Sequence, residues 1–165
     1  MSPYLLLPLF FLVAIAQTTL VPLLPTGDAR PDLFLVIVVA WGIVRGSGEA
    51  TLWGLAGGLV LDLLSGVPFG LQTIGLGGLG LLADVMETTF FRSNVLIPLI
   101  AVFLATFLFH VLEAAALQVF GYPIYWQNLI TRVILPTAVL NTLLMPIVYG
   151  ALRRIQQREH PRLMW

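Results

Sequence analysis

Apolar residues fill this chain in long runs, and short groups rich in Gly, Pro and charged residues separate one run from the next. Six runs are delimited in this way, at about residues 3–24, 32–45, 49–64, 71–86, 94–120 and 126–155. The separators include typical turn signals, such as Pro-Thr-Gly-Asp and Gly-Tyr-Pro. The pattern predicts an all-α chain of six helices.

The six predicted helices differ in length. Those at 3–24, 94–120 and 126–155 are long enough to cross a hydrocarbon core of about 30 Å at about 1.5 Å per residue. The helix at 32–45 would reach only about 20 Å. Because a short helix at membrane depth needs cover from other helices, we expect the second, third and fourth helices in the middle of a bundle. One alternative makes the second and third runs a single re-entrant hairpin, which leaves four spans.

Composition places the chain among polytopic membrane proteins. Of its 165 residues, 59% are hydrophobic and only 10% charged, and the mean hydropathy is +0.98. Soluble domains carry about 25% charged residues. No polar stretch is long enough for a separate soluble domain, so residues 1–165 are expected to form one integral membrane domain with a retained first helix. The chain has no Cys, and its formal net charge of zero argues against nucleic acid as a partner.

Six crossings would sort the arginines to one side of the membrane. Arg45, Arg92 and the arginines near the C-terminus would face the cytoplasm, whereas Arg30 would lie outside and Arg132 within the last helix. This distribution satisfies the positive-inside rule and predicts that both termini are cytoplasmic. The C-terminal group comprises Arg153, Arg154, Arg158 and Arg162, around a short tail at 156–165. It should attract anionic lipid at about 1 kcal/mol per charge, or contact a cytoplasmic partner.

A lone acid, Asp62, interrupts the third apolar run just before the Gly-Val-Pro-Phe-Gly turn of 66–70. A carboxylate at the bilayer centre costs about 2.5–3.5 kcal/mol, so it needs a partner, a water-filled cavity or an interfacial position. The predicted topology places Asp62 near the outer end of its helix, where that cost falls. Three roles stay open: the acid touches interfacial water, pins the turn by hydrogen bonds, or lines a pocket.

Other polar residues fall at a similar outer depth. Together with Asp62 they are Asp32, Gln72, His110, Glu113, Asn128 and Arg132. They suggest an outward-facing polar pocket, and the alternative is a set of hydrogen bonds that only hold the helices together. Glu113 and Arg132 lie at matching depths on helices joined by a short hairpin. We therefore expect an ion pair or a water-bridged contact between them.

Glycines at four-residue spacing allow helix backbones to approach closely in a bilayer. The candidates for helix packing, or for a face that holds a partner or a second copy of the chain, are Gly42, Gly46, Gly54, Gly58 and Gly77. The G-x-G-x-x-G of 75–80 matches a dinucleotide fingerprint, but it lies in a predicted membrane helix, so we interpret it as packing. His110 and Glu113 have helical spacing, yet too few further ligands accompany them to predict a metal site. We expect no cofactor and no enzymatic activity.

Four motifs occur in order along the first half of the chain. They are Arg-Pro-Asp-Leu at 30–33, Arg-Gly with Glu-Ala at 45–50, Gly-Leu-Ala-Gly-Gly-Leu at 54–59, and Asp-Leu-Leu-Ser-Gly-Val-Pro-Phe-Gly-Leu at 62–71. This succession resembles the rod shape-determining protein MreD family of bacteria. Length, the six-span pattern and short loops agree over the whole chain, whereas the motifs cover about residues 30–80.

The resemblance implies a non-enzymatic scaffold of the cell-wall elongation machinery in the cytoplasmic membrane, which maintains rod shape and regulates lateral peptidoglycan synthesis. It implies binding to the single-span protein MreC and, indirectly, to MreB, RodA and the elongation penicillin-binding transpeptidase. It also implies a six-helix bundle similar to the substrate-binding subunits of energy-coupling-factor transporters. The alternative function is therefore a vitamin-binding transporter subunit. Such subunits commonly carry A-x-x-x-A in the first helix, whereas here Ala14 is followed by Thr18.

Overall fold

The computed structural model describes residues 12–23, 25, 27–45, 48–85 and 96–159. Every regular element in these ranges is helical, as the apolar pattern predicts. The first described helix is α-helical over residues 12–15 and continues as the π-helix η1 (Ala16–Leu20) and the 3-10 helix η2 (Val21–Leu23). Its predicted beginning at residue 3 lies outside the described residues.

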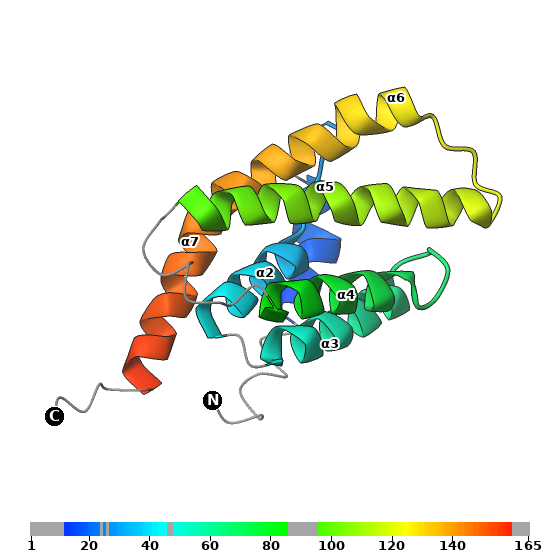
Figure 1. The fold of residues 1–165 in the computed structure, drawn as a ribbon. Coiled ribbons are helices and arrows are strands. Elements are labelled where there is room, and N and C mark those ends of the chain that lie inside the picture. Colours follow the sequence, from blue (N-terminus) through cyan, green and yellow to red (C-terminus); the bar gives the residue numbers. More distant parts are fainter. Residues whose placement is uncertain (1–11, 24, 26, 46–47, 86–95, 160–165) are drawn as a thin grey trace, which may run out of the picture.

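The later helices follow the predicted runs closely. They are α2 (Leu33–Arg45), α3 (Glu49–Leu64), α4 (Leu71–Val85), α5 (Leu96–Val119), α6 (Trp126–Asn128), the π-helix η4 (Leu129–Ile134) and α7 (Leu135–Glu159). The last three form one continuous helical run that returns along α5 (Figure 1). Helix α7 continues past the predicted end at 155, so the beginning of the predicted tail is helical.

Prolines shape this last run. Pro136 has no backbone N–H, so the carbonyl of Arg132 lacks the donor that an α-helix supplies four residues later. Local widening into a π-helix accommodates such a gap, and η4 ends directly before this point. Pro146 lies inside α7, and the run changes direction along this helix in Figure 1. Kinks of this kind are most often caused by proline.

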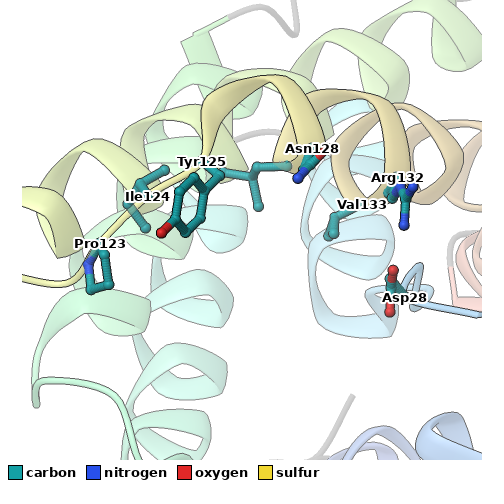
Figure 2. A pocket seen from close by; sticks show the side chains of 8 residues that line it. Asp28, Pro123, Ile124, Tyr125, Asn128, Arg132 and Val133 are labelled. Atoms are coloured by element: carbon teal, nitrogen blue, oxygen red, sulfur yellow. The ribbon is translucent and has the colours of Figure 1, made fainter.

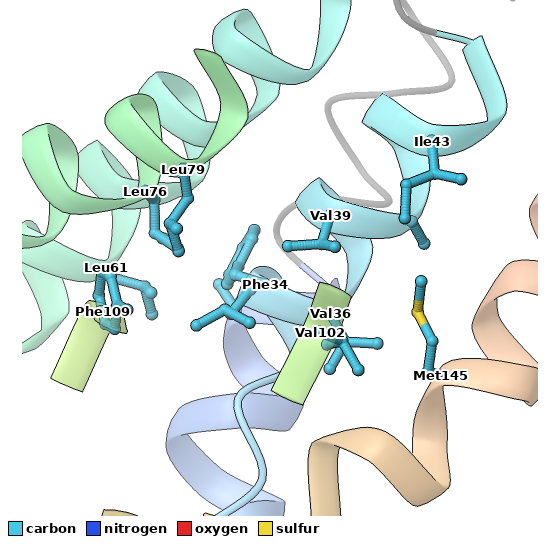
Figure 3. Packing of buried hydrophobic residues seen from close by; sticks show 13 residues of the cluster. Phe34, Val36, Val39, Ile43, Leu61, Leu76, Leu79, Val102, Phe109 and Met145 are labelled. Carbon is cyan, nitrogen blue, oxygen red and sulfur yellow. The ribbon is translucent and has the colours of Figure 1, made fainter. Parts of the chain in front are cut away.

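Helix α2 forms the centre of the fold. Nine of its 13 residues are buried, and it packs against α3, α4, α5 and α7. A helix that is apolar on all sides is expected in such a buried position. Its core residues Phe34, Val36 and Val39 are surrounded by side chains from the neighbouring helices (Figure 3). These neighbours include Leu61, Leu76, Leu79, Val102, Phe109 and Met145.

Helices α3 and α4 lie to one side of this centre as an antiparallel pair (Figure 1). The prediction that the second, third and fourth helices share the middle of the bundle is therefore wrong for two of them. Only six of the 16 residues of α3 are buried, and leucines such as Leu52 and Leu63 are exposed. Helix α4 likewise exposes Ile74 and Leu81. Contiguous apolar surface of this kind is typical of a membrane or protein contact.

Two helices are long and apolar enough to cross a membrane by length and composition. They are Leu96–Val119 and Trp126–Ile155. Helices Leu33–Arg45 and Leu71–Val85 are apolar but shorter. At about 1.5 Å per residue, α2 is about 20 Å long, as the sequence predicts. The long helices thus flank a short, deeply covered one.

Candidate functional site

Asp62 lies near the end of α3 and caps the beginning of α4. Its Oδ2 accepts the backbone N–H groups of Gly70 and Thr73, each at 3.0 Å, and the Thr73 hydroxyl at 2.5 Å. Its Oδ1 accepts the backbone N–H of Gln72 at 3.0 Å. The first turn of a helix leaves such N–H groups without intrahelical partners. Of the roles open to this buried acid, the structure shows that it pins the turn.

At the opposite end of the α3–α4 pair, a residue of α4 caps the beginning of α3. Asp84, near the end of α4, accepts the backbone N–H of Ala50 at 3.2 Å and that of Thr51 at 2.8 Å. The Thr51 hydroxyl donates to the same carboxylate at 2.7 Å. Each helix therefore ends in an aspartate that caps the start of the other. This role of Asp84 was not predicted, because the capped residues are more than 30 positions away in the chain.

Glycines bring the two helices into backbone contact. A Cβ at Gly54 would collide with the carbonyl of Leu76, and one at Gly58 would collide with the backbone of Gln72. Gly77 packs against α3 from the facing helix. Neither Gly54 nor Gly58 could gain even a methyl group without a backbone shift. These two glycines therefore pack within the protein and do not form a face for a partner.

The remaining glycines of interest are also internal where the structure describes them. Gly42 of α2 packs against Ala83 of α4, whereas Gly46 lies outside the described residues. In the G-x-G-x-x-G segment, Gly75 packs against the Phe109 ring, and the segment belongs wholly to α4. This confirms the interpretation of the segment as helix packing.

A second polar cluster joins four parts of the chain inside the core. Asp32 Oδ1 accepts the Gln17 side-chain amide at 3.0 Å and caps α2 by accepting the Leu35 N–H at 3.1 Å. The Asp32 N–H donates to Asn141 Oδ1 at 2.8 Å, and Asn141 Nδ2 donates to the Thr106 hydroxyl at 3.0 Å. The network therefore ties η1, the start of α2, α5 and α7 together.

Three members of this network were absent from the predicted polar set: Gln17, Thr106 and Asn141. The signal that marks Asn141 is its isolation in a long apolar run, which is the same signal that marks Asp62. Amides and hydroxyls in apolar helices commonly bond across helix interfaces. Which of them meet is decided by the packing of α5 against α7.

Glu113 pairs with an amide and not with an arginine. Its Oε1 accepts the Gln72 side-chain amide at 2.6 Å, which links α5 to the first turn of α4. Within the described residues an ion pair joins Arg45 to Glu49 at 2.9 Å, but none joins Glu113 to Arg132. The ion pair is therefore the wrong half of the prediction, and the water-bridged contact stays a prediction. The two residues were expected at matching depths, but depth does not determine how each helix is rotated about its axis.

Arg132 and Asn128 instead line a pocket with Asp28, which belongs to the loop before α2. The pocket has a volume of about 340 Å³, and Tyr125 and apolar residues complete its lining. Figure 2 shows the Asp28 carboxylate facing Arg132 across this pocket. Asp28, Asn128 and Arg132 are all exposed. The pocket thus offers a cation, an anion and hydrogen-bonding groups to an external ligand.

Five of the seven residues predicted to form one polar pocket lie together around Glu113: Gln72 bonds to it, and His110, Asp32 and Asp62 are within electrostatic range. The alternative, hydrogen bonds that hold the helices together, accounts for most of their contacts. The two aspartates cap helices, and Gln72 bonds to Glu113. His110 Nδ1 lies 3.0 Å from a carbonyl oxygen of its own helix. Asn128 and Arg132 instead line the pocket with Asp28.

The structure describes part of the predicted C-terminal group of arginines. Arg153 and Arg154 are exposed on α7, Arg158 belongs to the same helix, and Arg162 lies outside the described residues. Among the described residues, no group of three or more His, Asp or Glu could hold a metal ion.

Over the described residues, the fold and these contacts define an all-helical protein with two helices apolar enough to cross a membrane, whose buried polar groups connect helices. The family model of rod shape-determining protein MreD matches residues 1–155. The chain therefore belongs to the rod shape-determining protein MreD family, as the motifs at 30–80 predict, and has a role in rod shape determination. Comparisons with curated proteins and with solved structures give no match.

Proposed function

We propose that this chain is a non-catalytic scaffold of the cell-wall elongation machinery that binds MreC and helps regulate lateral peptidoglycan synthesis. Through MreC it is connected to MreB, RodA and the elongation penicillin-binding transpeptidase. The observation that supports a scaffold is the use of the buried carboxylates. Asp32 and Asp62 each cap a helix and bridge to another segment, so their hydrogen-bonding capacity serves assembly of the bundle.

The scaffold is proposed to cross the cytoplasmic membrane six times, with both termini in the cytoplasm. The arginine distribution along the sequence supports this topology. The packing of long helices around the short α2 supports it as well, because α2 is covered on every side by other helices. Reporter fusions in the 45–48 turn and in the 121–125 turn would test it, because the four-span alternative keeps the 45–48 turn from reaching the cytoplasm. Fusions that report both positions on the same side of the membrane would contradict six spans.

The partner helix of MreC is proposed to lie in a groove between α4 and α5. Two adjoining apolar pockets of about 170 and 420 Å³ share Leu79, Leu82 and Leu108, and together follow both helices. Gly78 lines this groove, and a Cβ there would have nothing within 4 Å. A small residue facing open apolar space admits the backbone of another transmembrane helix. Glu113 lies at one end of the groove as a hydrogen-bond acceptor.

The groove is tested by Gly78→Leu with Gly150→Leu as the matched control. Both glycines are helical and have no heavy atom within 4 Å of an added Cβ, so the fold should accept either side chain. Gly78→Leu should reduce co-purification of MreC about tenfold or more and cause rod-shaped cells to round up at normal protein levels. Gly150→Leu should leave both unchanged. Normal recovery of MreC with Gly78→Leu would place the partner on another surface.

A separate test addresses the function itself. Depletion of the protein should convert rods to spheres, and MreC should co-purify with the full-length chain in mild detergent. A vitamin that co-purifies with the protein, together with vitamin uptake into vesicles and normal cell shape on depletion, would instead establish the transporter alternative.

A further inference from the structure

We infer that the pocket lined by Asp28, Asn128 and Arg132 binds the zwitterionic headgroup of a membrane lipid, with its phosphate on Arg132 and its primary ammonium on Asp28. The natural lipid of this chemistry is a phosphatidylethanolamine. This site is separate from the groove between α4 and α5, and the inference does not depend on MreC binding. It explains an arginine that the helix packing leaves outside the core.

The position of Arg132 points toward lipid. It lies in η4 as the one charged residue of the sequence 126–150, and it is exposed. Beginning one turn beyond it, Leu135, Val139, Leu143 and Ile147 are all exposed at four-residue spacing and therefore form one apolar stripe. An acyl chain beside this stripe would extend from a headgroup held at Arg132. A guanidinium is the side chain best suited to bind a phosphate with two parallel hydrogen bonds.

Aromatic side chains indicate that the pocket lies at the level of lipid headgroups. Tyr122 and Tyr125 are exposed in the turn between α5 and α6, and Trp126 follows them with its indole N–H donating to Gln118. Tyr and Trp are enriched at membrane–water interfaces because their rings are apolar and their edges polar. Tyr125 also lines the pocket itself, so the pocket and the aromatic belt coincide.

The two charges of the pocket select the class of headgroup. Arg132 alone would favour any phosphate, but Asp28 across the pocket disfavours a second negative charge (Figure 2). A ligand with phosphate and ammonium a few bonds apart satisfies both. The primary ammonium of ethanolamine donates hydrogen bonds, which the quaternary ammonium of choline does not. Asn128 supplies a further donor for the phosphate. The π-helical winding of η4 is consistent with a functional site, since π-turns are frequent at such sites.

The test uses the full-length protein in nanodiscs with equimolar phosphatidylethanolamine, phosphatidylcholine and phosphatidylglycerol. After transfer to detergent, native mass spectrometry counts the lipids retained per chain. The wild type should retain one phosphatidylethanolamine in preference to the other two lipids. Equal retention of the three lipids would mean only a general lipid shell and would overturn the inference.

Variants separate the two contacts. Asp28→Asn should abolish the preference for phosphatidylethanolamine over phosphatidylglycerol while total retention persists. Arg132→Gln should lower retention of every phospholipid about tenfold or more. Arg154→Gln removes an exposed arginine of α7 outside the pocket and should change nothing. If Asp28→Asn keeps the wild-type preference for phosphatidylethanolamine over phosphatidylglycerol, the inference fails. This outcome holds even if Arg132→Gln does not fold.

Soluble phosphoethanolamine carries the same charges without acyl chains and distinguishes the two sources of this chemistry. A lipid site should resist displacement by it at concentrations at which lysophosphatidylethanolamine competes. Displacement by both at equal concentration would overturn the assignment to a lipid. MreC co-purification should be the same for Asp28→Asn and wild type, which keeps this test independent of the proposed scaffold role.

Discussion

The α3–α4 pair and the α5–η4 pair are both antiparallel helical hairpins, yet they use their polar residues in opposite ways. In the first hairpin, Asp62 and Asp84 cap the opposing helices, and glycines bring the backbones into contact. In the second, Arg132 and Asn128 stay exposed beside a pocket. The first hairpin is closed by its own polar groups, whereas the second leaves polar groups for a ligand.

The difference shows how to read isolated polar residues in an apolar chain. Asp62 is the more conspicuous in sequence, and it is fully engaged in holding two helices together. Arg132 is less conspicuous, and the structure leaves it accessible. A polar residue in a membrane helix is thus a candidate for binding only after the contacts it makes within the fold have been accounted for.

The largest effect is expected from alanine at the glycine contact. Gly54→Ala forces a methyl group onto the Leu76 carbonyl, and a backbone atom cannot rotate away, so the free energy of unfolding should fall by about 3 kcal/mol. Gly150→Ala on α7 meets open space and should be neutral or stabilise by about 0.5–1 kcal/mol through helix propensity. Unfolding in mild detergent measures both. Equal effects would show that the close backbone contact between α3 and α4 is not what makes Gly54 sensitive.

An intermediate effect is expected at the capping acid. In Asp62→Asn the new amide nitrogen cannot accept hydrogen bonds, so in either orientation of the amide at least one backbone N–H that Asp62 now caps loses its acceptor. The free energy of unfolding should fall by about 1.5–3 kcal/mol. Asp28→Asn, in the exposed pocket, should change it by less than about 0.5 kcal/mol. A stable Asp62→Asn protein with lost rod shape would show that the charge of Asp62 serves function as well as capping.

The smallest effect is the coupling between Glu113 and Arg132. Because Glu113 bonds to Gln72 and Arg132 lines a different pocket, Glu113→Gln and Arg132→Gln should be additive within about 0.5 kcal/mol. A double-mutant cycle on unfolding in detergent measures this. Coupling well beyond that limit would support an ion pair between Glu113 and Arg132. It would also argue against the proposed lipid site, since Arg132 would then already have a partner.

The helices were well predicted from the sequence because apolar runs and turn residues are local signals. The boundaries of α2, α3 and α4 agree with the predicted runs within a residue at each end. The position of these helices in the bundle was not predictable in the same way. Length suggested that three short helices share the centre, but only α2 is apolar on all sides, and α3 and α4 each keep an exposed apolar face.

The candidate site was predicted as a set of residues and not as an arrangement. The role of Asp62 at the 66–70 turn followed from its proximity in sequence to the groups it binds. Asn141 and Thr106 were missed, because their partners lie on other helices. Contacts between distant segments depend on how helices rotate and cross, which hydropathy alone does not report.

The sequence by itself determined the class of protein, the helices and the family, because these depend on composition, local periodicity and motif order. Only the tertiary structure decided which polar residues are used internally and which remain accessible. The physical reason is that a carboxylate, amide or guanidinium in an apolar chain must find partners, and packing chooses them. It chose neighbouring helices for Asp62 and Glu113, and it left Arg132 facing a pocket.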